Sequence, residues 1–271
     1  MAEMRVMTIL YRILVQKYKK KFYLCTIDRK NMLSKNQIKL IRSLELRKNR
    51  KAEGLFVAEG PKVVGDLLRA GFKPYATYST TERPDALLIS KSDLQRISFL
   101  QHPQEVLAVF HIPSPVSRPQ AEGNQLSLAL DGIQDPGNMG TIIRIADWFG
   151  INTVYCSPDT VDIYNPKVIQ ATMGSIAHVD IIYTDLLTLL EHADCPVYGT
   201  LLDGEDIYRQ ELSANGIIVM GNEGNGISQP VRRFITHKLY IPNFHAAEET
   251  AESLNVAIAT AITCSEFRRR N

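Results

Sequence analysis

The sequence predicts an α/β protein whose main sheet is mostly parallel, preceded by a smaller α/β domain. Two observations support this prediction. From residue 126 onward, short apolar runs alternate with segments of helical periodicity, which is typical of parallel strands covered by helices on both faces. Three prolines and several polar residues between 113 and 124 indicate a linker before that region.

The region before the linker is expected to comprise a basic extension, residues 1–31, and a small domain, residues 32–115. Ser34 is a candidate N-cap for a first helix whose apolar residues continue to Leu46, and Pro61 opens a second helix. Short strands are predicted at 55–58, 75–78, 86–89 and 106–110. The extension has no clean period, so its sequence leaves its order open.

The second domain is expected to cover residues 126–271, after a linker at 116–125. Its strands are predicted at 126–131, 153–156, 179–183, 196–201 and 217–220. Helices are predicted after the first of these strands, at 166–172, and from about Thr250 to Arg269.

The net charge of +2 conceals an uneven distribution of charge along the chain. Residues 1–51 hold 15 of the 31 Lys and Arg residues and only three acidic residues. A basic segment on an otherwise acidic body indicates a polyanionic partner, most simply nucleic acid. For any single cluster, such as residues 19–21, a solvated helical face is the alternative explanation.

Composition argues against several other classes of protein. The four cysteines and six histidines are scattered without the close spacing of a zinc site or a disulfide framework, so we expect no bound metal. No apolar run approaches the roughly 20 residues that span a bilayer, and no secretion signal is evident. We therefore expect a cytoplasmic protein with no membrane partner.

Polar residues follow the first strand of the second domain, at the edge where parallel sheets bind ligands. The loop at 135–140 leads into a helix, and this reading places Arg144 near the first helical turn. Asn138 and Arg144 are therefore expected to face one crevice. Taken alone, a helix arginine at this depth is more often a salt-bridge or surface residue.

A glycine-rich loop, residues 221–228, follows the strand at 217–220. Its glycines allow a tight turn and a close approach of the backbone to a ligand. A dinucleotide fingerprint is disfavoured, because it follows the first strand of its fold and only 45 residues remain after Gly226. A plain turn is the alternative, although it leaves Glu223 unexplained.

A third segment begins at Leu239 and resumes at the start of the final helix. Ser253 and Asn255 lie near this start, where backbone N–H groups are free. Ser253 as a simple helix cap is the alternative. Each of the three segments is weak evidence on its own.

Together and in this order, the segments resemble the three motifs of the SpoU (TrmH) family of RNA ribose 2′-O-methyltransferases, within the SPOUT class. The resemblance covers residues 126–268 and rests on Asn138-x-Gly140-x-x-x-Arg144, Gly221-x-Glu223-x-x-Gly226, and Ile241-Pro242 followed by Ser253-Leu254-Asn255-Val256. Residues 34–112 resemble the family's ribosomal-protein-like substrate-binding domain through Phe56-Val57-Ala58-Glu59-Gly60 and Val106-Leu107-Ala108-Val109.

The resemblance implies a trefoil knot in the C-terminal part of the sheet, an exception to the rule that chains avoid knots. It implies S-adenosyl-L-methionine as cofactor, bound by backbone groups at Gly221, Ile241 and Leu254, close to Thr200 and Leu201. It also implies a homodimer whose interface helps to complete the site, and rRNA or tRNA as the substrate.

Methylation of a ribose hydroxyl requires removal of its proton while the methyl donor is held in line. By resemblance, Arg144 activates the 2′-hydroxyl or orients it against a phosphate, and Asn138 positions it. Glu223, Ser253 and Asn255 would fix the arginine and the cofactor. Because a guanidinium normally stays protonated, anchoring an RNA phosphate is as defensible a role for Arg144 as acting as the base.

One segment departs from the family pattern: residues 243–250 make a longer and more acidic loop than the usual span before Ser-Leu-Asn. The sequence thus predicts a methyltransferase that uses S-adenosylmethionine and acts on a ribose 2′-OH of structured RNA, with rRNA favoured over tRNA. The alternative is a non-catalytic RNA-binding or ribosome-assembly protein on the same fold, against which the intact motif residues argue.

Overall fold

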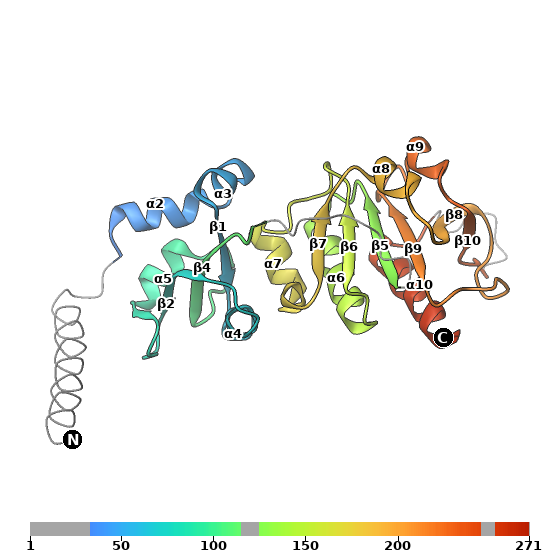
Figure 1. The fold of residues 1–271 in the computed structure, drawn as a ribbon. Helices are drawn as coiled ribbons and strands as arrows, with labels where there is room; N and C mark the ends of the chain where they lie inside the picture. Colours follow the sequence, from blue (N-terminus) through green and yellow to red (C-terminus); the bar gives the residue numbers. More distant parts are fainter. Residues whose placement is uncertain (1–32, 115–124, 245–252, 271) are drawn as a thin grey trace, which may run out of the picture.

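The computed structural model describes residues 33–114, 125–244 and 253–270, which form two β-sheets with their helices (Figure 1). The predicted extension at 1–31, the linker up to residue 124 and most of the acidic loop at 243–250 lie outside the described residues. No helix of the described ranges is both long and apolar enough to cross a lipid bilayer.

The N-terminal sheet is small and mixed. Its strands have the order β1-β4-β2-β3, where the bounds are β1 (Leu55–Glu59), β2 (Pro74–Ser79), β3 (Leu87–Leu88) and β4 (Val106–His111). The helices of this part are α2 (Lys35–Ser43), α3 (Arg47–Glu53), α4 (Pro61–Arg69) and α5 (Lys91–Ile97). The four predicted strands are therefore confirmed, although the third is shorter than predicted.

The first helix of the small sheet differs from the prediction at its C-terminal end. Ser34 is the predicted N-cap, and its hydroxyl accepts a hydrogen bond from the backbone N–H of Gln37. The sequence predicts a helix that continues to Leu46, but α2 ends at Ser43. The chain turns at residues 44–46, where Leu44 is fully buried in the core and Leu46 is exposed before α3.

The C-terminal sheet has six strands in the order β10-β8-β9-β5-β6-β7, and every pairing in it is parallel. Its strands are β5 (Leu126–Asp131), β6 (Thr153–Cys156), β7 (Asp180–Tyr183), β8 (Val197–Asp206), β9 (Gly216–Gly221) and β10 (His237–Tyr240). The helical segments are α6 (Pro136–Trp148), α7 (Pro166–Thr172), η1 (Ser175–Ala177), α8 (Leu186–Glu191), α9 (Gln229–Arg232) and α10 (Val256–Arg270). The predicted α/β class with a parallel sheet is confirmed.

Both faces of the central strands are buried, which explains their continuous apolar sequences. On β5, Leu128 and Leu130 pack in the cluster that contains residues of α6 and α10, whereas Ala129 packs in the cluster that contains residues of α8 and α9. Side chains on a strand alternate between its two faces. The sheet is therefore held between two helical layers.

The two sheets share one hydrophobic core through the segment around α7. Arg50 is almost fully buried and donates two hydrogen bonds to the carboxylate of Asp162, at 2.9 and 2.6 Å. The rings of Phe56 on β1 and Tyr164 lie with their centroids 4.7 Å apart. Figure 1 shows α7 between the two sheets. Apolar burial and an ion pair with matched hydrogen bonds therefore fix the small sheet against the large one.

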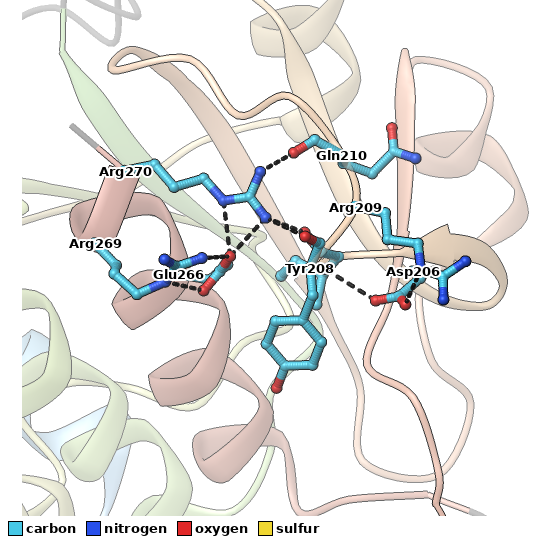
Figure 2. A network of polar contacts seen from close by, with 8 residues as sticks. Asp206, Tyr208, Arg209, Gln210, Glu266, Arg269 and Arg270 are labelled. Carbon is cyan, nitrogen blue, oxygen red and sulfur yellow. Dashed lines mark hydrogen bonds and ion pairs between the residues drawn. The ribbon is translucent and has the colours of Figure 1, made fainter.

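Helix α10 closes the described chain and is anchored at its C-terminal end. Figure 2 shows Arg270 reaching across to donate hydrogen bonds to the backbone carbonyls of Gln210 and Tyr208. The carboxylate of Glu266 pairs with Arg269 and Arg270 on the same helix. The sequence predicts a helix start near Thr250, but α10 begins at Val256, because the side chain of Asn255 caps it.

Candidate active site

The three motif segments meet at the carboxyl edge of the large sheet. Strands β5 and β9 are neighbours in register, so that Asp131 pairs with Gly221 at the point where both strands end. The loops that follow these strands therefore leave the sheet side by side. This is the edge at which open parallel sheets bind their ligands.

Asn138 lies in the first turn of α6, whereas the sequence reading places it in the loop before the helix. Asp135 is the N-cap, with its carboxylate accepting a hydrogen bond from the backbone N–H of Asn138 at 2.8 Å, and Pro136 is the first helical residue. An aspartate cap followed by proline is a regular helix start. Arg144 is therefore in the third turn of α6 and not near its first turn, which corrects that prediction.

The glycine-rich loop folds back on itself directly after β9. The backbones of Asn222 and Gly226 exchange two hydrogen bonds, at 3.0 and 2.9 Å. A Cβ atom on Gly221 would lie 2.2 Å from the backbone of Gly226 and of Ile227, so only glycine allows this close approach. The predicted tight turn is present, and a plain connection would not need a glycine here.

Glu223, in the glycine-rich loop, binds the residues at the start of α6. Its carboxylate accepts hydrogen bonds from the backbone N–H groups of Gln134 and Asp135, at 3.3 and 3.2 Å, and from the side-chain amide of Asn138 at 3.1 Å. Partial burial alone would raise the pKa of Glu223, but these hydrogen bonds, that of Asn138 foremost, hold the pKa below its ordinary value. The carboxylate is therefore charged at neutral pH.

Asn255 joins the third segment to the same network. Its side-chain N–H donates to the side-chain oxygen of Asn138 at 2.9 Å, across 117 positions of sequence. Its own side-chain oxygen accepts from the backbone N–H of Ala257 at 2.9 Å, which caps α10. Asn255, Asn138 and Glu223 thus form one continuous chain of hydrogen bonds. Ser253, two residues earlier, is exposed beside this chain.

Arg144 is exposed and stands apart from this chain. The described residues include no hydrogen-bond or ion-pair partner for it, so Glu223 holds Asn138 and does not hold the arginine as the sequence reading expects. Six helical positions separate Asn138 from Arg144, which turns their side chains about 120° apart at roughly 9 Å along the axis. The guanidinium is consequently free to bind another molecule.

Four of the residues predicted to hold the cofactor lie on, or directly after, three neighbouring strands, β10, β8 and β9. Thr200 and Leu201 are half-buried on β8, and the Thr200 hydroxyl contacts the sulfur of Met220 next to Gly221 on β9. Ile241 follows β10 directly and is half-buried. The structure thus brings these positions to one edge. Leu254, 49% exposed, precedes the cap of α10.

Strand β8 leaves the pairing at this edge. Lys238 of β10 pairs with Gly199, but the next residue, Leu239, pairs with Glu205, so five residues of β8 have no partner on β10. They begin with the predicted positions Thr200 and Leu201. Where β8 pairs with β10 again, the two backbones are close: a Cβ atom on Gly204 would lie 2.6 Å from the backbone of Leu239. A stretch of strand without a register partner on β10 suits a ligand that is bound by main-chain atoms.

The sequence reading missed two residues that build the site. The carboxylate of Asp131 accepts a hydrogen bond from the backbone N–H of Ser228 at 2.7 Å, which ties the end of β5 to the glycine-rich loop. Asn222 donates to the carbonyl oxygen of Gly132 at 2.7 Å, and its side-chain oxygen accepts from Gly224 and Asn225. An asparagine that opens a glycine-rich turn is a visible signal for this second role.

The arrangement can position a hydroxyl and an anion but carries no obvious nucleophile. The charged carboxylate of Glu223 and the amides of Asn138 and Asn255 are hydrogen-bonded together, and the guanidinium of Arg144 is exposed further along α6. Among the described residues, no group of three or more histidine, cysteine, aspartate or glutamate side chains could hold a metal ion.

Comparison with known proteins agrees with this geometry. The model of the SpoU rRNA Methylase family matches residues 125–265, and the model of the MRM3-like substrate binding domain matches residues 35–108. The 23S rRNA (guanosine(2553)-2′-O)-methyltransferase RlmP of Bacillus subtilis is 29% identical over 249 residues, which cover 87% of this chain and 97% of RlmP.

Solved structures give the same result. A TrmH-family protein from Porphyromonas gingivalis is 42% identical, with a TM-score of 0.78 over 89% of this chain and 100% of that one. An rRNA methyltransferase from Sinorhizobium meliloti with bound AdoMet is 31% identical, with a TM-score of 0.77 over 88% of this chain and 96% of that one.

Proposed function

Because the chain belongs to the SpoU rRNA Methylase family, we propose that it transfers a methyl group from S-adenosyl-L-methionine to a ribose 2′-hydroxyl of rRNA. The observation that supports this most is the hydrogen-bond chain from Asn255 through Asn138 to Glu223, which unites the three motif segments. The relatives named for rRNA, among them RlmP, favour rRNA over tRNA.

The residues present fit the cofactor. Gly221 lacks a side chain where the following loop doubles back, and Thr200 and Leu201 begin a stretch of β8 that has no partner on β10. Backbone groups at Gly221, Ile241 and Leu254 would hold the cofactor there. When bound, it supplies an electrophilic methyl group on a sulfonium centre.

Arg144 serves as the phosphate anchor in this proposal. A guanidinium keeps its proton at any physiological pH, so it is a poor base but a good bidentate ligand for phosphate. Its exposure and its lack of a partner among the described residues suit that role. Asn138, held from both sides, then orients the 2′-hydroxyl, whose proton passes to the neighbouring phosphate or to water.

The exposed faces of α6 and α10 support a homodimer. Trp148 is 84% exposed one helical turn beyond Arg144, and Leu254 and Ile258 are about half-exposed near the start of α10, which packs against α6. Asn255 contacts Asn138 and Arg268 contacts Phe149, so Trp148 and the two aliphatic side chains lie toward opposite ends of this helix pair. Exposed apolar side chains along one helix pair are a surface that a second copy can cover. A second copy that covers Trp148 would also lie over Arg144, and would help to complete the crevice.

The RNA-binding part of this proposal rests on the small sheet and the helices before it. Exposed basic side chains cluster on α2 and α3, at Lys35, Lys39, Arg42, Arg47, Lys48 and Lys51. They continue the basic character of residues 1–31, so the extension and the small domain at 32–115 would grip RNA phosphates. The domain at 126–271 would carry the chemistry and the trefoil knot, in a cytoplasmic protein that needs no metal.

The proposal is tested by incubating the purified chain with methyl-labelled S-adenosylmethionine and rRNA from cells that lack this protein. Alkaline hydrolysis leaves the bond after a 2′-O-methylated nucleotide intact, so label in alkali-resistant dinucleotides is the expected result. Tight RNA binding without any transfer would favour the alternative, a non-catalytic RNA-binding or ribosome-assembly protein. Label in single nucleotides would indicate methylation of a base.

A further inference from the structure

A cavity of about 260 Å³ lies between the two sheets, away from the motif loops. Its walls come from Val57 and Glu59 on β1, from Phe99 and Leu100 after α5, and from Lys167 and Gln170 on α7. Most of the cavity surface is apolar, and its polar side chains are Glu59, Lys167 and Gln170. A cavity lined in this way is typical of a binding site for a flat, mostly apolar molecule with a few polar groups.

The carboxylate of Glu59 is the polar centre of this cavity. It is 5% exposed and accepts hydrogen bonds from the backbone N–H of Phe99, at 2.7 Å, and from the hydroxyl of Ser98. Each carboxylate oxygen can accept two hydrogen bonds, so acceptor capacity remains. Burial raises the pKa of Glu59, although Ser98, Phe99 and the charge of Arg42 oppose this effect. A ligand with N–H donors would relieve the cost of burying this group.

The rest of the wall is suited to a nucleotide. The ring of Phe99 is held in place by Arg42, whose guanidinium lies 4.7 Å from the ring centroid and donates to the carbonyl of Ser98 at 2.7 Å. Lys167 is exposed, so it can contact a phosphate outside the cavity. Gln170 is half-buried and offers both a donor and an acceptor.

Helix α7 connects this cavity to the candidate active site. Ala171 lines the cavity, and a Cβ atom on Gly140 of α6 would lie 2.3 Å from the Cβ of Ala171. The short helix α7 therefore contacts both the cavity and α6, which carries Asn138 and Arg144. One RNA molecule can reach both, because the core shared by the two sheets holds them in a fixed arrangement.

We propose that this cavity receives an unstacked guanine base of the RNA substrate, at a nucleotide other than the one that is methylated. A carboxylate accepts hydrogen bonds only, and guanine is the base whose Watson–Crick edge offers two adjacent donors, N1–H and the N2 amino group. Sequence-specific RNA recognition commonly reads such splayed bases by stacking and edge contacts. This inference rests on the proposed function only in taking RNA as the partner.

The test uses fluorescently labelled octauridylates in which one central residue is guanosine, 7-deazaguanosine, inosine or adenosine. The full chain should bind the first two equally, because both keep the Watson–Crick edge. It should bind the inosine RNA about tenfold more weakly, because inosine lacks the N2 amino group and so loses one hydrogen bond to a charged group. Glu59→Gln should abolish the difference between guanosine and inosine. Glu82→Gln, an exposed position in the loop between β2 and β3, should preserve it.

A second variant covers the case in which Glu59→Gln does not fold. Gln170→Trp fills the cavity from α7 and keeps Glu59, so it should weaken binding of the guanosine RNA without lowering binding of octauridylate. Equal binding of all four RNAs by the unaltered chain would overturn the inference, and so would a guanosine preference that survives both variants. Methyl transfer to rRNA is measured in parallel: transfer without guanosine preference removes only this inference, and preference without transfer removes only the enzymatic function.

Discussion

The side chain of Asn255 donates a hydrogen bond to the side chain of Asn138 at 2.9 Å, although 117 residues separate the two. Asn138 in turn donates to Glu223 at 3.1 Å, so its amide is oriented from both sides. Because the amide of Asn138 is already oriented, no free energy is needed to reorient it when the reaction occurs. The positioning of the 2′-hydroxyl would depend on this pair.

Replacing Asn138 and Asn255 by alanine, singly and together, should reveal a coupled pair. We expect each single variant to lower kcat about 100-fold, within the range for loss of one preorganised group, and the double variant to lose little more. Single-turnover methyl transfer measures this. Asp185→Ala removes a helix cap on α8 and is the control for capping, with activity unchanged. Fully additive losses would show that the hydrogen bond has no role in catalysis.

Arg144→Ala should abolish methyl transfer, by about 100-fold or more, and leave the affinity for S-adenosylmethionine within about twofold. The guanidinium lies on α6, away from the strand ends that would hold the cofactor. Arg144→Lys should restore part of the activity, because a point charge also binds phosphate. Calorimetry and transfer assays measure the two quantities, with Arg209→Ala as the exposed control. Parallel loss of cofactor affinity would contradict the assigned role.

Gly221→Ala should displace the glycine-rich loop, because its Cβ would overlap the backbone of Gly226 and Ile227. Overpacking of this kind costs about 1–3 kcal/mol of stability. The affinity for S-adenosylmethionine should fall at least tenfold. Gly224→Ala in the same loop is the matched control, since its Cβ meets Asn222 only at 3.6 Å. If the two variants bind the cofactor equally well, Gly221 is not part of its site.

Glu223→Gln should destabilise the fold at neutral pH by about 0.5–1.5 kcal/mol, a small value because the group is partly exposed. Its pKa is lowered in the folded state, so its contribution is present above the ordinary value of 4.5 and is lost as the pH falls through the folded value. Urea unfolding at pH 7 and near pH 3 should therefore show a difference that shrinks in acid. Glu211→Gln is the exposed control, and a difference independent of pH would contradict this explanation.

Glu266 stabilises the end of α10 in the same pH-dependent way. Hydrogen bonds from Arg269, and then from Arg270, lower its pKa to about 2. Glu266→Gln should cost about 1–2 kcal/mol at pH 7, since Arg269 is largely exposed. The loss should begin to shrink below the ordinary pKa of 4.5 and vanish near pH 2. Thermal unfolding measures this against Glu191→Gln, and an equal cost at both pH values would exclude the ion pair as the cause.

The sequence is sufficient for five of the six strands of the large sheet, because the central ones are continuous apolar runs with buried faces. The edge strand β10 (His237–Tyr240) is not among the predicted strands, because only Leu239 in it is buried. The sequence fails where the local signal is weak or is overlooked. Strand β8 extends to Asp206 through polar residues that no apolar pattern marks. Asp135 and Pro136 are a sequence signal for the start of α6, but Gly137, which follows them, favours a loop.

The internal arrangement of the site could not be derived from sequence in the same way. Motif order places Asn138, Glu223 and Asn255 near one edge of the sheet, but which of them bond depends on tertiary packing over long sequence separations. The expected contact of Glu223 with Arg144 is replaced by one with Asn138 for this reason. Strand pairing brings together Asp131 and Gly221, and no local pattern reports that.

One substitution in the RNA tests the central claim most directly. Once the methylated nucleotide has been mapped, a synthetic RNA fragment with a 2′-deoxyribose at that nucleotide alone lacks the reacting hydroxyl and keeps every other contact. We predict that this fragment binds with unchanged affinity and accepts no methyl group, while the all-ribose fragment is methylated. Methyl transfer to the deoxy-substituted fragment would contradict ribose 2′-O-methylation.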